Sequence, residues 1–261
     1  MPEKGKSVWG YVRSLMILLL LCGMVTLAIF AFLHQRKRIC EDVSVTIEYG
    51  GTHKPVTEKE VVAIIEHSGL KVIGVEERNV NLAAIYDTLG NLPFVKAVNP
   101  IYFSGSTLNI DLQLHEFVAH VYPNNGNDYF ICADGTLLTY SPRIKERLLI
   151  ACGNIPALKT NSCDISQAGK TLNRIYDIAQ LIAADKFYSA QFKQLYVNAE
   201  KEFELIASVG KHTILIGDGS NAEEQLSQLR TVYKQGIAFM QPDKYSHLDL
   251  RYKNRIIAQK R

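Results

Sequence analysis

Two histidines and a glutamate in the run LHEFVAHVYP, residues 114–123, are residue types that bind zinc in many hydrolases. A helical zinc-protease motif places its histidines four residues apart, one turn above each other, with the glutamate beside the metal. His115 and His120 are five residues apart, and the alternation of apolar and polar residues before them predicts a strand. In a strand this spacing sends the two side chains to opposite faces, about 16 Å apart. We therefore expect no metal site here, and we expect His115 to be a solvated residue on the polar face of a sheet.

Two other runs match nucleotide-binding motifs only in part. The run AGKT, residues 168–171, lacks the upstream glycine of a phosphate-binding loop, because position 164 is Asp164. The run GDGSN, residues 217–221, lacks the spacing and the early βαβ unit of a dinucleotide site. The sequence contains no GxSxG run, and it suggests no nucleophile paired with a base. We therefore expect a protein that is not an enzyme, without catalytic residues, cofactor or metal; a membrane-anchored hydrolase is the less favoured alternative.

The N-terminal part of the sequence predicts a membrane anchor. Residues 15–33 carry no charged side chain, and they span about 28 Å as a helix, close to the hydrocarbon thickness of a membrane. We expect a tail over residues 1–13, an uncleaved transmembrane helix over residues 14–34 and a stalk over residues 35–41. No second apolar run is as long, so one crossing is predicted. Charge does not set the orientation, because three basic residues flank each end: Lys4, Lys6 and Arg13 on one side, Arg36, Lys37 and Arg38 on the other.

Composition narrows the class of protein further. With 261 residues and 47% hydrophobic residues, the chain has enough apolar surface for one sizeable core or two modest ones. The formal net charge of +3 is too small to indicate a nucleic-acid partner. The cysteines outside the anchor have no metal-binding CxxC spacing, and both a disulfide and four separate core residues remain open. These cysteines are Cys40, Cys132, Cys152 and Cys163.

Residues 42–116 predict a first folded unit. The run VSVTIEY predicts a strand, and Thr57 with Glu60 forms a capping box for a helix that ends at Gly69. A second amphipathic helix stops at Gly90. Two strands follow, over FVKAVNPIYF and TLNIDLQLHEF, so the predicted order is strand, helix, helix, strand, strand.

Residues 117–261 predict a second, β-rich unit. A hairpin across Asp134-Gly135, a strand over RLLIACG and an amphipathic helix over residues 172–182 come first. Three further strands over QLYVN, EFELIAS and TILIGD precede a helix over residues 222–234. The last run, SHLDLRYKNRII, alternates over residues 246–257 and predicts a long terminal strand with one packed face and one wet face. No strand follows it, so its outer edge is expected to be open to a partner strand.

The chain resembles the FtsQ (DivIB) family of cell-division proteins. The resemblance rests on the order of elements and on three runs: LPFVKAVNPIYF at residues 92–103, TLNIDLQLHEFVAHV, and HLDLRYKNRII. It departs from the family at Phe117 and Val118, where an arginine followed by a proline is common. The implied fold is α+β: an N-terminal transmembrane helix, a POTRA-like βααββ module and a C-terminal β domain ending in a long edge strand.

The resemblance also implies a function, a location and partners. It implies a non-enzymatic subunit of the divisome in the bacterial inner membrane, with a cytoplasmic N-terminus, a periplasmic body and enrichment at the septum. The implied partners are the small coiled-coil proteins FtsB and FtsL, and through them FtsW and FtsI. A POTRA-bearing chaperone or translocation factor is the alternative, but such proteins usually carry several POTRA modules or a membrane β-barrel.

The positions expected to contact the partner follow from the resemblance through the DLRY run. They are Arg251, Tyr252, Asn254 and Ile256, together with Lys201, which aligns with a basic contact position. Tyr252 is the expected aromatic anchor. In the alternative interpretation Tyr252 and Ile256 pack inward, and Arg251 is a solvated strand residue.

Overall fold

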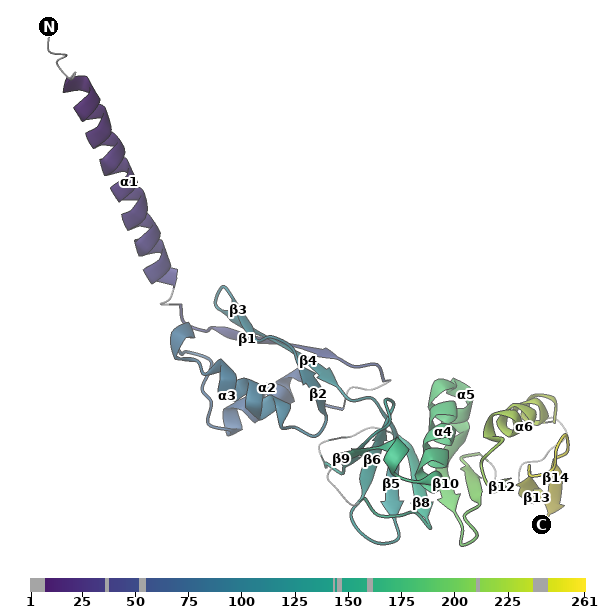
Figure 1. The fold of residues 1–261 in the computed structure, drawn as a ribbon. Helices are drawn as coiled ribbons and strands as arrows, with labels where there is room; N and C mark the ends of the chain where they lie inside the picture. Colours follow the sequence, from purple (N-terminus) through teal and green to yellow (C-terminus); the bar gives the residue numbers. More distant parts are fainter. Residues whose placement is uncertain are drawn as a thin grey trace. The chain divides into compact units, whose positions relative to one another are not determined.

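The structure is a computed structural model that describes residues 8–35, 38–51, 55–142, 144, 147–158, 162–209, 212–236 and 244–261. The fold is α+β, with one apolar helix at the N-terminus and a large sheet in the C-terminal half (Figure 1). Two compact units make up the chain. The first contains residues 1–47, 58–91 and 97–112, and the second contains residues 48–57, 92–96 and 113–261.

Helix α1, Val8–Gln35, is long and apolar enough to cross a membrane. Its segment Trp9–Ala31 has 23 residues and a mean hydropathy of 2.6, and at 1.5 Å per residue it spans about 35 Å. None of this segment is buried against the rest of the chain. An apolar surface of this size is stable in lipid rather than in water.

The described part of residues 42–114 has the predicted order of a strand, two helices and further strands. The elements are β1 (Asp42–Glu48), α2 (Glu58–His67), the short 3-10 helix η1 (Glu77–Asn79), α3 (Leu82–Gly90), β2 (Val95–Val98), β3 (Tyr102–Ser104) and β4 (Thr107–Leu114). The strand order is β1-β4-β2, with β3 also paired to β4. The strand predicted over residues 94–103 is divided between β2 and β3 at Pro100, which has no amide hydrogen to donate to a ladder.

Local signals explain where the two helices of this unit begin and end. Helix α2 starts directly after Thr57, and the chain leaves it at Gly69, whose positive φ of 80° suits a residue without Cβ. Helix α3 is capped by Asn81, whose side chain accepts a 3.0 Å hydrogen bond from the amide of Ala84.

In the residues that the structure describes, the second unit is a mixed sheet with three α-helices and one short 3-10 helix. The elements are β5 (Phe117–Pro123), β6 (Tyr129–Cys132), β7 (Thr136–Thr139), β8 (Leu149–Gly153), β9 (Ser162–Asp164), η2 (Ile165–Gln167), α4 (Lys170–Ala184), α5 (Lys186–Gln191), β10 (Phe192–Val197), β11 (Phe203–Ala207), β12 (Thr213–Gly217), α6 (Ala222–Gly236), β13 (Tyr245–Asp249) and β14 (Ile257–Lys260). The strand order is β14-β13-β12-β11-β10-β8-β5-β6-β7-β9. Three pairs are parallel: β5 with β8, β8 with β10, and β12 with β13.

Helices α4, α5 and α6 cover one face of this sheet. Helix α4 lies against β5 and β8, and α5 lies against β10. The apolar side of each strand joins the helices in one core, which includes Ala151, Leu195, Ile214 and Leu248. Large apolar side chains on the opposite face are exposed, among them Tyr122, Ile150 and Tyr196.

The two histidines of the run LHEFVAHVYP lie in different surroundings. His115 follows β4, and its side chain is only 13% exposed, so the prediction of a solvated residue is wrong. The β5–β6 pairing brings His115 toward the turn after β6, and its Nδ1 atom lies 3.7 Å from Oδ2 of Asp134. His120 lies within β5 among the rings of Tyr122, Phe130 and Tyr140. The five cysteines are free thiols, so the sheet is held without a disulfide.

Candidate partner-binding site

The terminal run is not one long strand, so that prediction is wrong. Strand β13 ends at Asp249, the chain reverses, and β14 returns antiparallel to β13. Two local features make the reversal. The carboxylate of Asp249 accepts a 3.0 Å hydrogen bond from the amide of Arg251, and Asn254 has a left-handed φ of 58°. The amide of Arg255 closes the turn on the carbonyl of Tyr252 at 3.2 Å.

The edge of the sheet is therefore the short strand β14. Among the residues that the structure describes, β14 pairs with β13 on one side and with no strand on the other. Its backbone amides and carbonyls on the outer side are placed where a partner strand would bind. The loop between β13 and β14 holds most of the residues expected at the partner-binding surface.

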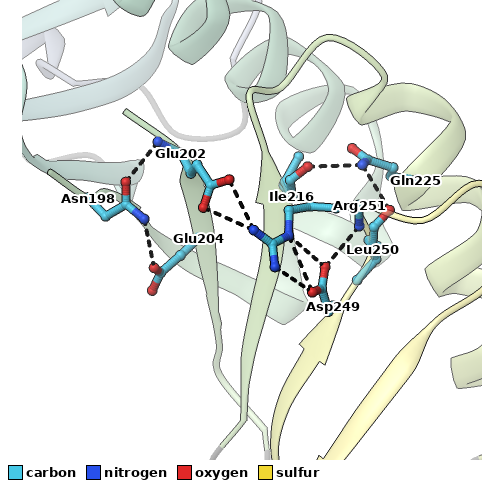
Figure 2. Close-up of polar contacts among 8 residues, drawn as sticks. All are labelled: Asn198, Glu202, Glu204, Ile216, Gln225, Asp249, Leu250 and Arg251. Atoms are coloured by element: carbon cyan, nitrogen blue, oxygen red, sulfur yellow. Dashed lines mark hydrogen bonds and ion pairs between the residues drawn. The ribbon is translucent and has the colours of Figure 1, made fainter. Parts of the chain in front are cut away.

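Arg251 is the centre of an ion-pair network at the start of this loop (Figure 2). Its Nη2 atom lies 2.8 Å from Oδ2 of Asp249, and its Nε atom lies 3.1 Å from Oδ1 of the same carboxylate. Its Nη1 atom lies 3.1 Å from Oε1 of Glu202, in the connection between β10 and β11. The planar guanidinium therefore binds one carboxylate with two nitrogens and a second carboxylate with the third.

Two buried residues, Gln225 and Gly217, support this network. Gln225 of α6 donates hydrogen bonds to the carbonyls of Ile216, at 2.9 Å, and Leu250, at 3.0 Å, which ties the helix to β12 and to the loop (Figure 2). Gly217 has a φ of 83°, and a Cβ there would lie 2.9 Å from Cγ of Arg251. Glycine at this position therefore lets the aliphatic part of Arg251 lie directly over the end of β12.

The turn that contains Lys201 is brought beside Arg251 through Glu202. The side chain of Asn198 accepts a 2.8 Å hydrogen bond from the amide of Glu202 (Figure 2). The amide of Lys201 donates to the carbonyl of Asn198. Lys201 itself has a left-handed φ of 62° and an exposed side chain. The turn is thus fixed by its neighbours, while the ammonium of Lys201 faces solvent.

The predicted contact residues differ in how accessible they are. Tyr252 is 50% exposed and Asn254 is exposed, so neither packs inward. Ile256 is half-buried against the core of the sheet, as the alternative interpretation expected for that residue. Arg251 is 40% exposed but fully engaged by two carboxylates, so it is neither a buried residue nor a free solvated one.

The charges of the network stabilise one another. The hydrogen bonds that Arg251 donates to Asp249, and then to Glu202, raise the pKa of Arg251, which stays a cation at every accessible pH. The hydrogen bond from Arg251 lowers the pKa of Asp249 despite its partial burial. The ionised pair is therefore favoured from mildly acidic to basic pH.

Comparison with known families assigns both units. The model of the family described as FtsQ/DivIB, C-terminal related, matches residues 116–259, more than half of the chain. The chain belongs to the FtsQ/DivIB family. A POTRA-like domain matches residues 38–113 of this FtsQ/DivIB-like protein, and the family is one of cell-division proteins. A search of curated proteins found no match.

Sequence reasoning missed three residues that build this surface of the FtsQ/DivIB-like protein: Glu202, Gln225 and Asp249. The sequence could have indicated the role of Asp249, because an aspartate side chain often accepts a hydrogen bond from the backbone amide two residues later and so favours a turn. No local sequence pattern indicated the roles of Glu202 and Gln225, because these roles depend on which strands and helices become neighbours in the fold.

Proposed function

We propose that the protein is a non-enzymatic, single-pass subunit of the bacterial divisome that binds the FtsB–FtsL complex. Its N-terminus lies in the cytoplasm, helix α1 crosses the membrane, the chain after α1 lies in the periplasm, and the protein is enriched at the division septum. Arg251, Tyr252 and Asn254, with Lys201, form the binding surface beside the open edge of β14. Ile256 holds the hairpin on the core from inside, and contact with FtsW and FtsI is indirect.

One observation supports this proposal: the loop that leads into the edge strand β14 carries the exposed Tyr252, and Arg251 of this loop is joined through Glu202 to the turn that holds the exposed Lys201. Backbone hydrogen bonds to an added strand are worth about 1 kcal/mol each. A half-exposed tyrosine beside them supplies the apolar contact that interface anchors commonly provide. The short length of β14, four residues, makes these side-chain contacts more important for affinity and specificity.

The test is a photocrosslink from position 252 in dividing cells. A photoreactive amino acid replaces Tyr252, and captured proteins are identified by mass spectrometry. The matched control is Tyr86 of α3, which is 49% exposed and lies in the other unit. Capture of a small single-pass coiled-coil protein from position 252 and not from position 86 supports the proposal.

Two outcomes contradict it in different ways. If position 252 captures nothing while the protein concentrates at midcell, the division role stands and the binding surface is wrong. If position 252 captures unfolded envelope proteins instead, the protein acts as a chaperone, and the FtsB–FtsL proposal fails.

A further inference from the structure

Three potential metal ligands meet beneath the β6–β7 turn, far from the Arg251 network in the sequence. They are His115, which follows β4, Cys132 at the end of β6, and Asp134 in the turn. One ligand atom from each residue lies within 4.8 Å of the other two. All three residues belong to the second unit. Donor atoms of a tetrahedral zinc site lie about 3.3–3.8 Å apart, so small rotamer changes bring these three into coordination distance.

Burial distinguishes two members of this cluster, His115 and Cys132, from ordinary surface residues, whereas Asp134 is exposed. Cys132 is completely buried, and Nδ1 of His115 is a buried atom with no hydrogen-bond partner among the described residues. A buried polar atom without a partner destabilises a fold by about 1–3 kcal/mol. A bound cation would satisfy this nitrogen and the adjacent carboxylate together.

The same three residue types also occur in cysteine nucleophile sites, but the structure does not support that chemistry. A nucleophilic thiol must reach its substrate, and the side chain of Cys132 has no exposed surface. Burial strongly raises the pKa of its thiol, which disfavours the reactive thiolate. A metal ligand has no such need for exposure, because the ion replaces the thiol proton.

We propose that His115, Cys132 and Asp134 form a zinc-binding site. Sulfur, imidazole nitrogen and carboxylate oxygen suit Zn²⁺ better than Mg²⁺ or Ca²⁺, which prefer oxygen ligands. The thiol proton leaves to solvent as the thiolate binds the ion. Asp134 also lines a cavity of about 570 Å³ within the second unit, which gives the ion a path and leaves room for water as a fourth ligand. The ion would tie the β4–β5 connection to the β6–β7 turn.

Lys96 competes with the metal for the same carboxylate. Its Nζ atom lies 2.9 Å from Oδ2 of Asp134, where it balances the negative charge when no ion is bound. The side chain of Lys96 is 43% exposed, so it can turn into solvent when an ion enters. A positive charge this close weakens metal binding, and its removal should strengthen it.

The test uses the full-length protein in detergent, stripped with a chelator and titrated with zinc or cobalt. Zinc affinity comes from competition with a chromophoric chelator, and cobalt reports thiolate ligation through its sulfur-to-metal charge-transfer absorption. We expect one equivalent of zinc and a higher unfolding temperature when it is bound. Cys132→Ser should weaken zinc binding about 100-fold and abolish the charge-transfer band. Cys152→Ser, in the same sheet, is the matched control and should change neither.

Lys96→Met separates a metal site from an ordinary ion pair. If the cluster binds zinc, this variant should bind it about tenfold more tightly. The proposal is overturned if the wild-type protein binds no stoichiometric zinc, if Cys132→Ser binds it as well as wild type, or if Lys96→Met binds it more weakly. These results do not depend on FtsB or FtsL, so they leave the proposed partner untouched.

Discussion

Asp249 and Asp134 make the same local turn in two regions of the second unit, yet their surroundings differ. Each accepts a hydrogen bond from the amide two residues later: Arg251 at 3.0 Å and Thr136 at 3.1 Å. Each also binds a basic side chain, Arg251 or Lys96. Arg251 fills both oxygens of its aspartate and reaches Glu202 as well, whereas Lys96 makes one point contact and a neighbouring histidine nitrogen stays unpaired.

This difference shows how a shared turn is used in two ways. A guanidinium has five donors in a rigid plane, so it satisfies two carboxylates and fixes the backbone around them. An ammonium is a compact charge on a flexible stem and leaves room beside it. At Asp134, burial acts to raise the pKa, but hydrogen bonds from Lys96 and Thr136 outweigh it and lower the pKa to about 2. The carboxylates of the first region are fully paired, whereas the second region leaves Nδ1 of His115 without a hydrogen-bond partner among the described residues, and the proposed zinc ion would bind this nitrogen.

The largest effect on the Arg251 region should come from Gln225→Ala. The side chain is 9% exposed and donates to two carbonyls, so its loss leaves buried acceptors unpaired. We expect the free energy of unfolding to fall by about 2–3 kcal/mol, measured by denaturant titration. Gln228→Ala in the same helix is the control, because Gln228 is only half-buried and donates to the side chain of Glu224, and we expect it to cost less than about 0.5 kcal/mol. Equal effects of the two variants would mean that Gln225 does not hold the loop.

A smaller effect should follow from Gly217→Ala. The alanine must adopt a left-handed backbone conformation, and its Cβ must also displace the side chain of Arg251. We expect a loss of about 1–2 kcal/mol in the free energy of unfolding, together with weaker capture of FtsB by a crosslinker at position 252. Gly69→Ala is the control, because Gly69 also has a φ of 80° but no heavy atom near its Cβ position. Both variants should lose stability, and only Gly217→Ala should lose capture.

Arg251→Ala should change stability less than it changes binding. The arginine is partly exposed, and exposed ion pairs contribute less than about 1 kcal/mol. Without it, Glu202 and Asp249 repel each other and the loop loses its position, so capture from Tyr252 should fall several-fold. Arg251→Lys should restore only part of the capture, because one ammonium group cannot bind two carboxylates with the fixed geometry of a guanidinium. Full capture by Arg251→Ala would show that the network does not position the surface.

The smallest effect is a pH dependence from His120. Burial lowers the pKa of this histidine below 6.5, and the nearby Asp128 only partly opposes the shift. The folded state therefore holds the neutral form, and the unfolded state takes up a proton first as the pH falls. Stability should be full above about pH 6.5 and decrease below it, until the lowered pKa is passed. His120→Phe, which suits the surrounding rings of Tyr122, Phe130 and Tyr140, should flatten part of this dependence in unfolding temperatures measured from pH 8 to 5. An unchanged profile would assign the dependence to other groups.

Much of the fold could be predicted because its signals are local. The apolar run of α1, the start of α2 after Thr57, the Asp134-Gly135 turn and the apolar stripes of α4 and α6 each depend on a few neighbouring residues. The chain reversal after Asp249 was not predicted, because the alternation of apolar and polar residues continues through Leu250 and Tyr252. Such an alternation does not indicate where the chain changes direction. Lys253-Asn254 was the available turn signal, since asparagine tolerates the left-handed conformation that it adopts here.

The charged clusters could be predicted less well because they join distant segments. His115 reaches Asp134 only because Phe117 pairs with Cys132 in the β5–β6 ladder. Arg251, which follows β13, reaches Glu202, which precedes β11, because only the one strand β12 lies between β13 and β11 in the sheet. Strand order and register decide both contacts, and neither follows from spacing in one sequence.

Among the described strands, the hairpin of β13 and β14 pairs only with β12, by a parallel ladder of three residue pairs. A segment attached in this way opens locally at a lower free energy than the central strands. Its amides should therefore exchange with deuterium sooner than those of β8 or β10, which have neighbours on both sides. A strand added at β14 would give the hairpin a second neighbour and slow that exchange. Binding of a partner strand would then both cover the edge of β14 and stabilise the fold of the β13–β14 hairpin.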